Sequence, residues 1–164
     1  MKRIAPVVVV VTLVSMLVSA VVYAHCEVPC GIYGDQRRFE QMLEDGETIA
    51  KAIDQINDLS TKDDALSRNQ LARWVSTKES HATNVQHIIA QYFMTQRIKP
   101  GTDDASTAAY VKKLTSAHAV MQAAMKCKQT VDPASAKRLN TTILDFYRAY
   151  EGKEPKFGGH AKKG

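Results

Sequence analysis

Apolar residues recur at helical spacing through most of this chain. Four stretches, 36–57, 66–93, 108–125 and 136–150, place them at steps of three and four residues. This period is that of a helix with one buried face. No stretch shows the sustained alternation of apolar and polar residues that indicates a strand. The pattern therefore predicts four amphipathic helices.

Turn and capping residues lie between these stretches. Asp35 is placed to cap the first helix, Pro100 and Gly101 end the second, and Asp132 with Pro133 opens the fourth. The connections are short, and short connections join helices that run antiparallel. We expect an all-α fold, an antiparallel four-helix bundle over residues 35–151.

The first 24 residues differ from the rest. Lys2 and Arg3 precede an almost unbroken apolar run over 4–22, which is typical of an export signal or a membrane anchor. Ala24 ends a plausible signal-peptidase site, so we expect a cleaved leader at 1–24 and an exported protein, periplasmic or extracellular. An unprocessed leader would be the chain's contact with a membrane. If the segment is a pro-segment instead, the protein is cytoplasmic after its removal.

Charge is mild and dispersed. The 22 Lys and Arg residues against 17 Asp and Glu residues give +5, and loss of Lys2 and Arg3 with the leader leaves +3. Basic residues are interspersed with acidic ones except in the tail, 152–164, which we expect to be flexible. Nothing resembles a basic stripe for nucleic acid, so no nucleic-acid partner is expected.

The segment 25–34 contains Pro29, two glycines, Gly31 and Gly34, and a high density of metal donors. After cleavage before His25, the donors are its amine, its imidazole, the Cys26 amide nitrogen, and the thiolates of Cys26 and Cys30. Fused chelate rings of nitrogen and sulfur favour flat coordination, which suits nickel(II) or copper(II). The alternative is that Cys26 and Cys30 form a short disulfide loop in an exported protein. We call 25–34 the hook.

The order His-Cys-X-X-Pro-Cys-Gly-X-Tyr at 25–33 resembles the nickel-hook signature of nickel superoxide dismutases, and 35–40 resembles that family's entry into its first helix. The likeness covers about residues 25–150. It implies four-helix subunits preceded by an irregular metal-binding hook and assembled as a hexamer, with one nickel ion per subunit. It also implies disproportionation of superoxide into dioxygen and hydrogen peroxide through nickel(II) and nickel(III).

The resemblance assigns roles to five residues. His25, Cys26 and Cys30 match the nickel ligands, and Tyr33 matches a tyrosine that borders the approach of the substrate. Metal-bound histidines usually require a partner that orients the ring. Glu40 is the candidate for that partner, because the family uses a glutamate from its first helix.

Other chemistry-bearing residues have plainer interpretations. Cys127 is far in sequence from the hook, and we expect it to be a free thiol. His81, His87 and His118 lie singly among helical residues, so we expect core or surface histidines. Besides the enzyme, the sequence permits an exported helical module that binds metal without turnover, or an interaction module whose Cys26 and Cys30 are bridged.

Overall fold

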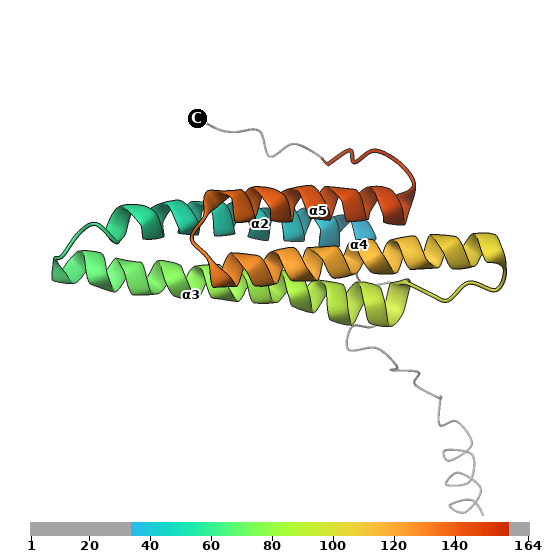
Figure 1. The fold of residues 1–164 in the computed structure, drawn as a ribbon, viewed down its shortest axis with the longest axis horizontal. Helices are drawn as coiled ribbons and strands as arrows, with labels where there is room; N and C mark the ends of the chain where they lie inside the picture. Colours follow the sequence, from blue (N-terminus) through green and yellow to red (C-terminus); the bar gives the residue numbers. More distant parts are fainter. Residues whose placement is uncertain (1–33, 158–164) are drawn as a thin grey trace, which may run out of the picture.

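The computed structural model describes residues 34–157, and in this range the chain forms four antiparallel helical rods without a strand. The helices are α2 (Asp35–Leu59), α3 (Ala65–His87), its direct continuation η1 (Ile88–Arg97), α4 (Asp104–Gln129) and α5 (Pro133–Glu151). Each rod packs against the two next to it in a ring (Figure 1). The expected all-α four-helix bundle is thereby confirmed. The leader and hook residues 25–33 lie outside the described residues.

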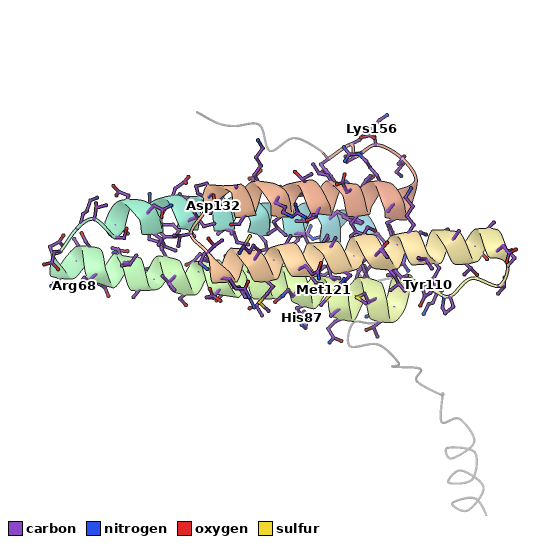
Figure 2. The ribbon with its side chains drawn as sticks, viewed as in Figure 1. Arg68, His87, Tyr110, Met121, Asp132 and Lys156 are labelled. Carbon is purple, nitrogen blue, oxygen red and sulfur yellow. The ribbon has the colours of Figure 1, made fainter. Side chains whose placement is uncertain are left out.

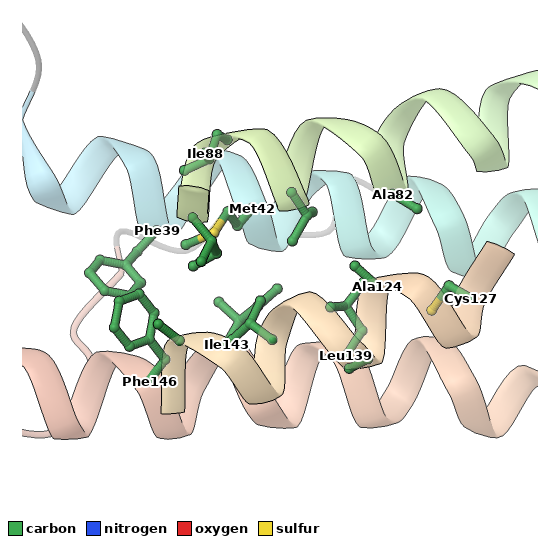
Figure 3. Packing of buried hydrophobic residues seen from close by; sticks show 14 of the residues in the cluster. Phe39, Met42, Ala82, Ile88, Ala124, Cys127, Leu139, Ile143 and Phe146 are labelled. Carbon is green, nitrogen blue, oxygen red and sulfur yellow. The ribbon is translucent and has the colours of Figure 1, made fainter. Parts of the chain in front are cut away.

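The core changes in character along the bundle axis. At one end the rings of Phe39 and Phe146 pack together, with centroids 5.2 Å apart, and Phe93 lies 4.8 Å from Phe39. Toward the other end small side chains, Ala82 and Ala124, occupy the interior (Figure 3). The aromatic end is the end at which α2 begins, so the hook joins the bundle where the core is bulkiest.

Aspartates cap three of the helices. Asp64 accepts a hydrogen bond from the backbone of Ser67, Asp103 from that of Ser106, and Asp132 from that of Ala134. Each bond satisfies a backbone N–H that the helix leaves without a partner. The expected opening of the fourth helix at Asp132 is confirmed.

The first helix begins differently, and the expectation that Asp35 caps it is wrong. The capping position belongs to Gly34, which provides no side-chain bond, and Asp35 is the first helical residue. The carboxylate of Asp35 points instead toward η1 and α5, where it accepts stronger donors than a backbone amide.

The second rod changes its helical winding near its end. From Ile88 to Arg97 it is a π-helix, and the backbone N–H of Ile98 donates to the carbonyl of Phe93, five residues earlier, at 2.8 Å. The sequence pattern predicts one continuous helix here, because the apolar spacing carries no sign of the change. Long π-helical stretches are rare and concentrate at functional sites.

Four apolar positions of the predicted stripes are exposed rather than buried: Leu66, Val75, Val111 and Met125. The rods differ in length, so the α2–α3 end extends past the turn between α4 and α5, and the start of α4 extends at the opposite end (Figure 1). Leu66, in the first turn of α3, lies on the first of these extensions. Met125 is 43% exposed because Ala124 and Cys127 take the buried face of α4.

The chain turns back after α5. Gly152 adopts the left-handed conformation that ends the helix, with φ of 70°. Arg148 then pairs with Glu154, and the ring of Phe157 packs edge-on against Tyr147 with centroids 5.0 Å apart. Lys156 lies on this returning segment (Figure 2). Among the described helices, none is apolar over a length sufficient to span a bilayer.

Candidate functional site

Four of the five predicted site residues, His25, Cys26, Cys30 and Tyr33, lie outside the described residues. The structure instead describes the end of the bundle to which they are joined by the chain. At this end α2 begins, η1 and α5 finish, and three side chains from η1 and α5 converge on the first residue of α2. These side chains form one hydrogen-bonded polar group at this end of the bundle.

Asp35 is its centre. The hydroxyl of Tyr92 donates to Oδ1 of Asp35 at 2.6 Å, and Oδ2 accepts from Tyr150 Oη and Arg97 Nη2, both at 2.7 Å. The side chain of Asp35 is only 16% exposed. Asp35, Tyr92, Arg97 and Tyr150 are called the Asp35 network below. It ties the start of α2 to the ends of two other elements.

The network shifts the acidity of its members. Burial alone would raise the pKa of Asp35, but the bonds from Arg97, Tyr92 and Tyr150 outweigh it and lower the pKa below its usual 3.8. Burial and the bond to the Asp35 carboxylate raise the pKa of Tyr92 and of Tyr150 to about 12. At neutral pH the network is therefore one carboxylate held by two neutral phenols and a guanidinium.

Three cations, one of them Arg97 of the network, lie near the rings of the two tyrosines. The guanidinium carbon of Arg38 lies 5.5 Å from the centroid of the Tyr92 ring, and that of Arg97 lies 6.0 Å from it. Lys113 Nζ lies 5.1 Å from the ring centroid of Tyr150. Cations over aromatic faces are attracted by the ring quadrupole. Three cations and one carboxylate leave this cluster with a positive balance.

Glu40, the fifth predicted site residue, lies outside this network. It is one turn beyond Gln36 on α2, and its Oε1 accepts a hydrogen bond from Gln36 Nε2 at 3.2 Å. Its side chain is partly exposed. Gln36 itself accepts a 3.3 Å bond from the hydroxyl of Tyr147 on α5. Glu40 is therefore linked to α5 only through Gln36, and its predicted contact with His25 lies outside the described residues.

Aromatic rings of the core pack against the two tyrosines of the network. The Tyr150 ring contacts the rings of Phe93 and Phe146, with centroids 5.2 and 5.8 Å away, and Tyr92 packs edge-on against Phe93 at 5.1 Å. Both phenols are consequently held in place by fully buried neighbours. A hydroxyl on such a ring has little freedom to leave Asp35.

The remaining candidate residues of the sequence are elsewhere in the bundle. Cys127 is a buried free thiol, as expected, and burial raises its pKa although Ser135 and Lys78 partly offset that effect. Nδ1 of His81 lies 2.6 Å from Oδ1 of the buried side chain of Asp45, within hydrogen-bond distance. Over residues 34–157, no three His, Cys, Asp or Glu side chains gather closely enough to hold a metal ion.

The sequence pattern alone does not predict the Asp35 network. Tyr92 and Tyr150 occur at apolar helical positions, where the pattern predicts core or interface residues, and Arg97 precedes the helix stop without any motif. One signal was available. In an antiparallel bundle the start of the first rod lies beside the ends of the second and fourth, so polar groups at 35, 92–97 and 150 share one end.

Comparison with known proteins gives one match. The family model for nickel-containing superoxide dismutase matches residues 20–154, a span that includes the hook and the whole bundle. No curated protein and no solved structure matches the chain.

Proposed function

The chain belongs to the nickel-containing superoxide dismutase family, an oxidoreductase family that uses nickel, and on that premise we propose that the mature protein disproportionates superoxide at a nickel ion held by the hook. Two superoxide anions and two protons give dioxygen and hydrogen peroxide. The observation that carries the proposal is the nine-residue pattern at 25–33, which lies within the span of the family match.

The donor set of the hook fits nickel. His25 offers an amine and an imidazole once it is the first residue, and Cys26 and Cys30 offer thiolates beside the Cys26 amide. Soft sulfur with strong nitrogen donors in a flat arrangement suits nickel(II) better than zinc, which prefers a tetrahedron. Bound there, nickel supplies one-electron chemistry by alternating between nickel(II) and nickel(III). We propose one nickel ion per subunit, with His25, Cys26 and Cys30 as its ligands.

Side chains around the hook serve the substrate and the ligands. We propose that Tyr33 borders the approach of superoxide and that Glu40 orients the imidazole of His25. The positive balance of Arg38, Arg97 and Lys113 favours the arrival of a small anion at this end of the bundle. Steering of this kind weakens as salt is added.

The decisive experiment compares two chains that differ by one residue at the start. One begins at His25 and the other retains Ala24, so that the amine lies one residue too far forward. We expect stoichiometric nickel and superoxide turnover only in the chain that begins at His25. Equal turnover by the longer chain would remove the amine from the proposed ligand set.

Cysteine variants test the thiolates separately. Cys26→Ser and Cys30→Ser should abolish turnover while circular dichroism stays helical, because the bundle has its own core. Cys127→Ser is the matched control, and its turnover should be unchanged. A disulfide between Cys26 and Cys30 in fresh, nickel-exposed protein would contradict the enzyme and favour a module without turnover.

Processing and assembly are further parts of the proposal. We propose a cleaved leader at 1–24 that exports the protein, a hook at 25–34, a bundle at 35–151, a basic tail at 152–164 whose first residues pack back onto α5, and a hexamer of such subunits. Intact mass of the secreted fraction should correspond to a start at His25. Sedimentation should give the mass of six subunits, and a monomer at micromolar concentration would contradict the assembly.

A further inference from the structure

The bonds to Asp35 exceed what the first turn of α2 requires. In α3, α4 and α5 the opening aspartate caps its own helix. In α2 the aspartate stands one position further in, leaves the capping position to Gly34, and gives both carboxylate oxygens to η1 and α5. The start of α2 therefore has no side-chain cap, and the bonds of Asp35 hold it against η1 and α5 instead.

The π-helical winding of η1 makes this arrangement possible. Tyr92 and Arg97 are five residues apart, and in an α-helix of 3.6 residues per turn they would point about 140° away from each other. In a π-helix the hydrogen bonds run between residues five apart, so such residues lie above one another. The bond from Ile98 to Phe93 shows this register. Both side chains consequently reach the two oxygens of Asp35.

Asp35 is also where the hook is tied to the bundle. Tyr33 precedes it by two residues and Cys30 by five. At the maximum reach of an extended chain, Cys30 lies within about 18 Å of Asp35. The position of the start of α2 therefore limits where the predicted ligands can lie.

We propose that the Asp35 network positions the hook on the bundle, and that the π-helical segment η1 serves this purpose. Its members are positioning residues, since they act through the backbone at Gly34 and Asp35. This inference rests on the proposed nickel function of the hook. A purely structural role would instead make the network one more contribution to folding, with no effect specific to residues 25–34.

Two tyrosines provide a matched comparison. Tyr150→Phe removes a hydroxyl bonded to Asp35. Tyr110→Phe removes one from a partly buried ring on α4 that packs against the same core but does not belong to the network. In chains that begin at His25, we expect Tyr150→Phe to speed nickel release to a chelator by about tenfold. It should also alter the electron paramagnetic resonance line shape of the oxidised nickel. Tyr110→Phe should do neither, and equal release rates in the two variants would overturn the proposal.

A second comparison works without metal and so separates this inference from the nickel function. Asp35→Asn and Asp45→Asn each change a carboxylate of α2 that accepts hydrogen bonds from another helix, and the sites are ten residues, about 15 Å, apart. In the metal-free protein, amide hydrogen exchange over 31–34 should accelerate severalfold in Asp35→Asn alone. Equal exchange in both variants refutes the positioning role. Failure of the unchanged chain to bind nickel refutes the proposed function, and this exchange result still decides whether the network holds the hook.

Discussion

Lys78 provides the sharpest test of how this bundle is held together. Its side chain is only 4% exposed, although lysine is rarely buried, and it crosses from α3 to the end of α4. There Nζ donates to the carbonyl oxygens of Cys127 and Lys128, both at 2.7 Å. These carbonyls belong to the last turn of α4, where no backbone N–H remains to bind them. The ammonium replaces that partner and complements the helix dipole.

We expect Lys78→Met to destabilise the protein by about 2–4 kcal/mol. Methionine keeps the volume of the apolar stem but leaves two carbonyls without a donor, at about 1–3 kcal/mol each. Relief from burying an ammonium offsets part of that loss. The contact of Lys78 with Glu79 adds little, because Glu79 is 43% exposed.

Urea unfolding followed by circular dichroism measures the difference at a fixed protein concentration. Lys126→Met is the matched control, since Lys126 lies in the same turn of α4 as the two carbonyls but is exposed. Its effect on the free energy of unfolding should stay within about 0.5 kcal/mol. A loss below about 1 kcal/mol for Lys78→Met would refute the reasoning, because it would mean that water satisfies the two carbonyls equally well.

Three further predictions concern the aromatic end of the bundle. Phe39 is fully buried among four aromatic rings. In urea unfolding, Phe39→Ala should therefore lower the free energy of unfolding by about 3–5 kcal/mol and Phe39→Leu by about 1–2 kcal/mol. Equal losses in the two variants would contradict tight packing around this ring. Because the folded pKa of Asp35 is lowered, its contribution is present above about pH 4 and is lost as the pH falls through the folded pKa. Unfolding free energies measured on acidification should therefore fall less in Asp35→Asn than in the unchanged chain. Tyr92 and Tyr150 have folded pKa values of about 12, so they stabilise the fold fully below pH 10.0, and that stability is lost as the pH rises through 12. In a phenolate absorbance titration of the chain that begins at His25, two of its five tyrosines should ionise late, and Asp35→Asn should bring both forward.

Local properties of the chain determined the helices, and they predict the chemistry of the hook. Helical spacing of apolar residues located all four rods, because burial of one face imposes that period wherever the helix lies. Asp132 and Pro133 marked the start of α5, since capping is decided within a turn. His25, Cys26 and Cys30 indicated a metal site, because chelation by neighbouring residues depends on their order along the chain.

Only the tertiary structure decided what depends on neighbours distant in sequence. Asp35 looked like a cap, but donors from η1 and α5 compete for its carboxylate once the rods are assembled. Leu66 belongs to an apolar stripe and is nevertheless exposed, because the rods are unequal in length. Lys78 has no partner within its own turns apart from Glu79, and its burial follows from the place where α4 ends. Periodicity specifies which face of a helix is apolar, whereas the lengths and junctions of the other helices decide what that face and its polar neighbours meet.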